Sequence, residues 1–227
     1  MKIKWSGTGM VDGRGKIGGH VASRNRSGAY VRTKVTPVNP NTVAQSAARN
    51  ILSTFSQAWS GLTQQIIAAW NSAVSDYATT DVFGDLHNPT GKNLYTRLNA
   101  NLASVGVAAI GTPPLPAAVP AATITAVTID ITTPSYEAAF SGDDASVNYQ
   151  VWATPGLSPG ISFVSSEYRQ IGSFVGGLGS PYDFEADYLS KYGAPAAGQK
   201  VFFKMVPVNN TTGQKGIGST GSTLVVS

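Results

Sequence analysis

The residues of this chain that could do chemistry are few and widely spaced. The segment Gly13-Arg-Gly-Lys-Ile-Gly18 has the glycine spacing of a dinucleotide-binding loop. Such a loop works only between a buried strand and a helix whose N-terminus faces the pyrophosphate. No apolar strand pattern precedes these glycines, and no helical pattern follows them. We therefore interpret the glycines as part of a flexible arm that packs closely against another chain.

Histidines and cysteines offer no clear catalytic or metal site. His20 and His87 are far apart in the sequence, and they could share a site only if Asp81 or Asp85 converged with them. We interpret both as surface histidines beside loops. The chain has no cysteine, which excludes disulfides, thiolate metal sites and cysteine nucleophiles.

The grouped carboxylates have simpler interpretations than catalysis. Asp143 and Asp144 lie in a Gly-Asp-Asp-Ala-Ser segment that is typical of a hairpin turn, because aspartate side chains bond to nearby backbone. A calcium site would need more oxygen ligands at close spacing. Asp183, Glu185 and Asp187 alternate, which predicts a solvated strand face rather than an acid–base pair. We expect no catalytic residue, no cofactor and no metal, and hence a protein that is not an enzyme.

A basic cluster is the more informative feature. Residues 1–49 contain nine lysines and arginines and one acid, whereas residues from 111 onward contain five basic and eight acidic residues. The basic head therefore predicts a negatively charged partner. Arginine suits carboxylates, and arginine and tyrosine are common at interfaces. Cations can also bind phosphates without reading sequence. The predicted docking residues are Arg24, Arg26, Tyr30, Arg32, Lys34 and Arg49.

Two elements are expected to carry these residues. Residues 1–40 predict an extended, glycine-rich basic arm, with strands at 20–24 and 29–35 around a hairpin turn. Residues 41–110 predict a helical docking domain. Thr42 and Gln45 fit a capping box at the start of its first helix, which ends near Gly61. Thr63 can cap a second helix, and a third should start near Pro89.

The remaining sequence predicts a linker followed by strands. Residues 111–122 contain four prolines, which favour a semi-rigid spacer between two domains. Residues 123–227 then alternate strand-like runs with turns, as in an antiparallel β-sandwich. The predicted strands are 123–132, 136–141, 147–153, 161–174, 182–189, 200–208 and 222–226. The expected fold class is thus α+β in two domains.

Two parts of the chain resemble known families. Tyr149-Gln-Val-Trp152-Ala resembles the third strand of a fibronectin type III or immunoglobulin-like domain, and residues 201–213 resemble its sixth strand and the following turn. The usual early tryptophan on the second strand is missing. The run Gly15 to Arg32, followed by Pro37-Val-Asn-Pro-Asn-Thr42 and Gln45, is similar to a segment of virion proteins of tailed bacteriophages. That segment carries no known catalytic residue.

The second resemblance implies a virion structural protein that docks on other virion proteins, such as capsid or tail subunits. Its expected role is that of an auxiliary or decoration protein of the capsid, with the sandwich displayed outward. A tail or head–tail connector component is the first alternative, and a nucleic-acid-binding protein using the basic arm is the second. The sequence leaves open whether the protein forms a homo-oligomer. No signal-like or membrane-spanning run is expected, so assembly is expected in the cytoplasm of the bacterial host.

Overall fold

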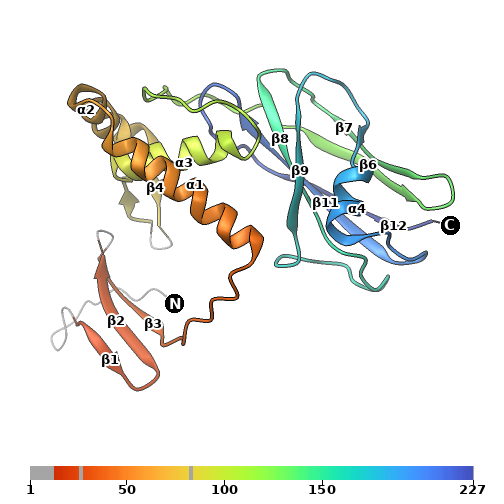
Figure 1. Cartoon of the computed structure of the whole chain (residues 1–227), viewed down its shortest axis with the longest axis horizontal. Coiled ribbons are helices and arrows are strands. Elements are labelled where there is room, and N and C mark those ends of the chain that lie inside the picture. The colour runs from red at the N-terminus through yellow and green to blue at the C-terminus, as the bar shows by residue number, and fades with distance from the viewer. Residues whose placement is uncertain (1–12, 26–27, 82–83, 227) are drawn as a thin grey trace. The chain divides into compact units, whose positions relative to one another are not determined.

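The protein is a mixed α+β chain with four helices and several small antiparallel sheets among the residues that the structure describes (Figure 1). The structure is a computed structural model that describes residues 13–25, 28–81 and 84–226. It forms two compact units. The arm unit holds the described residues up to Ala48 together with Thr79–His87. The main unit holds Arg49–Ala78 and the described residues from Asn88 onward.

The arm unit consists of two small antiparallel sheets and the start of a helix. Its elements are β1 (Gly15–Ile17), β2 (His20–Asn25), β3 (Gly28–Thr33), β4 (Thr79–Thr80), β5 (Leu86–His87) and the first turns of α1 (Val43–Ser60). Strands β1, β2 and β3 form one sheet in that order, and β4 pairs with β5. The predicted hairpin of β2 and β3 is confirmed. Sequence reasoning missed β1 and the β4–β5 hairpin.

The helices begin where the capping patterns predict them. The Thr42 hydroxyl accepts a hydrogen bond from the Gln45 N–H, and the Thr42 N–H donates to the Gln45 side chain, each at 3.3 Å. Thr63 accepts from the Ile66 N–H, as expected of an N-cap. The helices that follow in the main unit are α2 (Gln64–Ser72), the 3₁₀ turn η1 (Ala73–Tyr77) and α3 (Gly91–Ala103). Thr90 caps α3.

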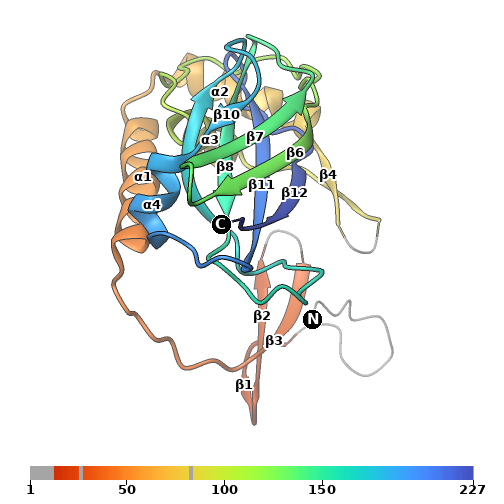
Figure 2. The same ribbon diagram turned by 90° about the vertical axis from the view of Figure 1, so that its right-hand side faces the viewer.

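Two sheets make up the rest of the main unit. One has the strand order β10-β7-β6 and the other β12-β11-β8-β9. In Figure 2 the strands β6 and β7 cross in front of β8, β11 and β12. The elements are β6 (Thr123–Asp130), β7 (Ser135–Ser141), β8 (Val147–Ala153), β9 (Arg169–Val175), β10 (Tyr182–Asp183), α4 (Glu185–Tyr192), β11 (Lys200–Asn209) and β12 (Ser219–Leu224).

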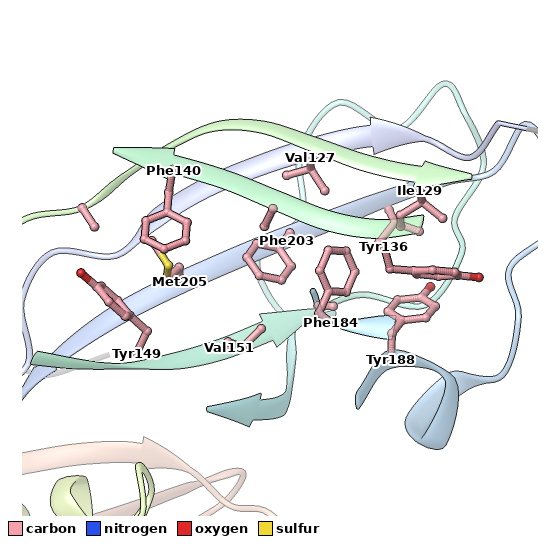
Figure 3. Close-up of a cluster of buried hydrophobic side chains, with 14 of the residues drawn as sticks. Val127, Ile129, Tyr136, Phe140, Tyr149, Val151, Phe184, Tyr188, Phe203 and Met205 are labelled. Atoms are coloured by element: carbon pink, nitrogen blue, oxygen red, sulfur yellow. The ribbon is translucent and has the colours of Figure 1, made fainter. Parts of the chain in front are cut away.

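The core lies between these two sheets. Alternate residues of β8 and β11 point inward, as the period of two requires, and meet side chains from β6 and β7 (Figure 3). Phe184 and Tyr188 pack on the same cluster, with the Phe184 ring 4.7 Å from that of Phe203. A second cluster, built around Trp70 and Tyr95, holds α2 against α3. Each fully buried aromatic side chain stabilises its cluster by about 1.5–3 kcal/mol.

Two strand predictions and one hairpin-turn prediction were wrong. The expected strand 182–189 is only two residues long, because α4 begins at Glu185. Phe184 and Tyr188 are buried in the core, and Tyr192 is half-buried against it. Their spacing of four residues is the period of a helix and not of a strand. The expected strand 161–174 starts only at Arg169. The segment around Asp143 connects two different sheets, so it is not a hairpin turn.

The proline-rich segment has no regular secondary structure, but it is hydrogen-bonded to its surroundings. The Trp70 indole N–H donates to the Gly111 carbonyl at 2.8 Å, and the Tyr77 hydroxyl donates to the Pro114 carbonyl at 2.9 Å. The Ala117 N–H donates to the Gln214 side chain. Proline removes backbone donors and keeps carbonyl acceptors, so nearby donors can still bind such a segment. A semi-rigid spacer between two independent domains would make no such hydrogen bonds to either domain.

Hydrogen bonds join α3 to the turn after β11, and join the residues that follow α3 to strand β8. The Asn101 side chain donates to the Gly213 carbonyl at 2.8 Å, and the Asn148 side chain donates to the Val105 carbonyl at 3.3 Å. Gln150 bonds to the Ser104 hydroxyl. The helices and the two sheets therefore lie within one compact unit.

Candidate docking surface

Pairing within the three-stranded sheet of the arm unit sorts its basic residues onto two faces. Directly paired residues in antiparallel strands share a face, and neighbours along a strand alternate. Lys16 pairs with Val21, and Val21 pairs with Arg32, so these three form one row across the sheet. Tyr30, two residues from Arg32, pairs with Ser23 on the same face. We call the face with Lys16, Tyr30 and Arg32 the Arg32 face.

The opposite face is less basic. Arg24 pairs with Ala29, and His20 pairs with Ile17 and Thr33. By the same alternation, Arg24 and His20 share this second face, which we call the Arg24 face. Tyr30 and Arg32 thus lie on one side of the sheet, and Arg24 lies on the other. Sequence reasoning had grouped all three.

The other predicted docking residues are not on this sheet. Lys34 follows the end of β3, where its N–H donates to the Gly19 carbonyl at 2.7 Å. Arg49 belongs to α1 and falls in the main unit. Arg26 lies outside the described residues. The structure therefore places Tyr30 and Arg32 on one face of the sheet together with Lys16, and Arg24 on the other face.

Lys16 could have been found from the sequence. Its strand is joined to β2 by Gly18-Gly19, a dipeptide typical of two-residue hairpin turns. Gly18 has φ +54°, a left-handed conformation that glycine adopts without steric cost. We had interpreted this dipeptide as part of a flexible arm. The same strand contradicts a dinucleotide loop, since Gly15–Ile17 continues into a hairpin and not into a helix.

The arm unit has no core of its own among its described residues. In the ranges 13–25, 28–48, 79–81 and 84–87, every residue is exposed or half-buried. The side chains of Lys16, Arg32 and Lys34 are exposed, and Tyr30 is half-buried. Residues 13–48 contain six lysines and arginines and no acid. The sheet is thus a basic surface with little apolar burial to stabilise it.

Helix α1 likewise presents an uncovered surface. It is 18 residues long, and none of its residues is buried. Phe55 and Trp59 pack against Tyr95, with ring centroids 6.3 and 5.6 Å away. Nearer the start of the helix, Val43 and Leu52 are 89% and 58% exposed. Arg49 is its only charged residue, so most of the exposed helix is polar without charge or apolar.

The scattered carboxylates have structural partners. Asp143 accepts hydrogen bonds from the backbone N–H groups of Gly177 and Gly179, and Asp144 accepts from that of Ser146. A hydrogen bond from the Ser146 side chain, followed by this backbone bond, lowers the pKa of Asp144. The Tyr182 hydroxyl donates to Asp187 at 2.7 Å. Across the described parts of the chain, no three His, Asp or Glu side chains converge as a metal site would need.

The comparisons with known proteins add no relative. The chain matches no protein-family model, no curated protein and no solved structure. Within the described ranges, no helix has the length and apolar character needed to cross a bilayer. What the protein does must therefore be argued from its own surfaces.

Proposed function

We propose that this protein is a non-enzymatic structural component of a tailed-bacteriophage virion, most specifically an auxiliary or decoration protein of the capsid. It docks on other virion proteins through the arm sheet and α1 and displays its C-terminal sheets outward. The similarity of the N-terminal segment to phage virion proteins supports this proposal. The observation that carries it is a basic sheet with no buried side chain among its described residues.

A three-stranded sheet whose described residues include no buried side chain is not expected to be stable on its own. Independent sheets need a hydrophobic face or a packed helix, because ordering each residue costs about 1–2 kcal/mol. None of the described arm residues is buried, so that cost is not offset within the arm unit. A partner that covers one face would supply the missing burial. The sheet is therefore suited to a chain that completes its folding on a larger assembly.

Charge indicates what kind of surface that partner offers. The Arg32 face combines Lys16 and Arg32 with the half-buried ring of Tyr30. A guanidinium group binds carboxylates through two parallel hydrogen bonds, and tyrosine adds contact area at interfaces. An acidic, partly apolar protein surface fits this combination. The nearly uncharged α1 fits the same role, because interface cores are depleted in charge.

The two facing sheets support a fibronectin type III or immunoglobulin-like sandwich as the displayed part. Three strands face four, and the third strand of this half, β8, pairs with the sixth, β11. The fifth strand, β10, is reduced to two residues and is followed by α4. Such sandwiches carry no common chemistry, which agrees with a role in display or binding.

Incorporation into particles tests the proposal directly. We expect the double variant Lys16→Glu/Arg32→Glu to lower the copy number in purified particles by about tenfold or more, because it replaces two positive charges of the Arg32 face by negative ones. The single variant Arg24→Glu is the matched control on the other face and should have a smaller effect. Circular dichroism should show that both variants keep the folded main unit. Unchanged incorporation of the double variant would refute docking through this face.

The position of the protein in the particle separates the capsid role from its alternative. A copy number comparable with that of the capsid subunit supports a decoration protein. Labelling confined to the tail or to the head–tail junction would instead support a connector or tail component, and would overturn the capsid assignment.

Nucleic-acid binding is the second candidate, favoured by the basic sheet that carries Tyr30 on the same face as Lys16 and Arg32. Duplex DNA of any sequence should then bind the free protein, with an affinity that falls steeply as salt rises. A gel-shift titration with the wild type and with Lys16→Glu/Arg32→Glu decides the matter. Tight, salt-sensitive binding that the double variant loses would replace the protein-docking proposal.

A further inference from the structure

A groove crosses the outer face of the larger sheet, where the loop before β9 lies over β11 and β12. Its volume is about 450 Å³, within the range of small-ligand sites. Phe203 and Met205 point into the core, so Phe202 and Lys204 on the same strand point outward. The lining includes Phe163, Tyr168, Phe202, Lys204, Thr220 and Ser222.

Lys204 is the charged group of this groove. It pairs with Trp152 on one side and with Thr220 on the other, which fixes its place in the middle of the outer face. Its ammonium group lies 5.8 Å from the centre of the Tyr168 ring. No carboxylate of the described residues forms an ion pair with it. A half-buried cation that is steadied only by a ring face can still bind an anion.

The walls add hydroxyl groups and aromatic surface. Ser162, Ser165, Thr220 and Ser222 line the groove, and in the described part of the chain their hydroxyls make no hydrogen bond. Phe163 is 79% exposed at the loop, so its ring is uncovered. Burial raises the pKa of Tyr168, and its neutral hydroxyl can donate a hydrogen bond beside Lys204. No acid lines the groove.

We propose that this groove binds an acidic saccharide, a sugar chain that carries carboxylates of the hexuronate type. Lys204 would bind a sugar carboxylate, the four free hydroxyls would exchange hydrogen bonds with sugar hydroxyls, and Phe163 would pack on the C–H face of a ring. This inference concerns the main unit alone, so it does not depend on the docking proposal.

The alternatives fit the groove less well. Single-stranded nucleic acid binds along a track of several cations with stacked aromatic rings, whereas Lys204 is the only cation in this lining. A neutral sugar would leave Lys204 without a counterion. The combination of one cation, several hydroxyls and an exposed ring favours an anionic sugar.

Calorimetric titration of the full chain with trigalacturonate tests the proposal, and its methyl ester serves as the matched neutral ligand. We expect the free acid to bind, the ester to bind about tenfold more weakly or not at all, and the affinity to fall as sodium chloride rises from about 0.05 M to about 0.5 M. Equal binding of acid and ester, or no binding of the acid, would overturn the proposal. Equal competition by inorganic phosphate, or preferential binding of oligothymidylate, would also overturn it.

Three variants locate the binding. Lys204→Gln should weaken binding of the acid by about tenfold or more, whereas Lys191→Gln, which removes an exposed charge on α4, should leave it unchanged. Phe163→Ser should weaken binding by about threefold or more, and its exposed position makes it harmless to folding. If Lys204→Gln did not fold, Phe163→Ser would still decide. Wild-type affinity in both Phe163→Ser and Lys204→Gln would show that the ligand binds elsewhere and would refute binding in this groove.

Discussion

Replacing Gly213 by alanine should reveal how firmly α3 is held against the larger sheet. Gly213 has φ +70°, a conformation that costs a residue with a Cβ atom about 1–2 kcal/mol. A Cβ atom there would also stand 2.4 Å from the Leu98 carbonyl oxygen and 3.1 Å from Leu102 Cγ. Since the first of these atoms is backbone, either α3 or the turn after β11 must move.

A matched substitution isolates the contact from the backbone cost. Gly106 has nearly the same conformation, φ +73°, and nothing lies within 4 Å of a Cβ atom built on it. Gly106→Ala should therefore lower the free energy of unfolding only by the cost of the backbone conformation, about 1–2 kcal/mol. Gly213→Ala should lose that amount and about 1–3 kcal/mol more for overpacking. The difference between the free energies of unfolding of the two variants measures the cost of moving α3 and the turn after β11 apart.

Urea denaturation of both variants and the wild type measures this difference. Trp59 and Trp70 report on the helices and Trp152 on the sheet, so fluorescence and far-ultraviolet circular dichroism should give one coincident transition. The reasoning fails if Gly213→Ala is no less stable than Gly106→Ala. Such equality would mean that Leu98 moves away freely, as expected if residues 111–122 join two independent domains.

Three further predictions address single contacts in the main unit. Trp70→Phe keeps a ring beside Tyr95 but leaves the Gly111 carbonyl without its donor. It should destabilise the protein by about 1–3 kcal/mol and speed proteolysis near residues 111–117. Unchanged thermal unfolding and an unchanged cleavage rate would contradict this prediction. Glu137 and Asp183 are direct partners across β7 and β10, so Glu137→Lys should stabilise by about 0.2–1 kcal/mol in urea denaturation, whereas the control Glu167→Lys in an exposed loop should not. Burial, followed by the charge of Asp143, raises the pKa of Tyr149 from 10.0 to about 12; the folded state therefore holds a proton that the unfolded state releases, and this contribution to stability is complete below pH 10 and lost between pH 10 and about 12. Urea midpoints of the wild type should fall over that range, less so in Tyr149→Phe, and parallel pH profiles would show that Tyr149 is not responsible.

Local patterns predicted the elements that local interactions stabilise. Thr42 with Gln45, and Thr63, mark helix starts because a side chain three residues from its partner can reach an unpaired N–H group. Strand β8 has the predicted limits, and every second residue from Val147 to Ala153 belongs to the core cluster, as the strand period requires. The basic composition of the arm likewise follows from the sequence alone.

Contacts between distant segments could not be predicted in this way. The acids Asp183, Glu185 and Asp187 alternate, which is typical of a solvated strand, but burial of Tyr188 in the core favours a helix over Glu185–Tyr192. Only the register of β1, β2 and β3 shows that Lys16 joins Arg32 and that Arg24 faces the other way. The groove around Lys204 likewise needs a loop and two strands that are remote in sequence.

The sequence thus determined where α1, α2 and α3 begin, the limits of β8, and the basic composition of the arm. These properties depend on residue type and on spacings of two to four residues, where backbone geometry alone decides which groups meet. The tertiary structure decided which basic residues share a face, how residues 111–117 are held, and where a cation lies among free hydroxyls. Those outcomes depend on strand register and on side-chain packing between remote segments, which no local spacing encodes.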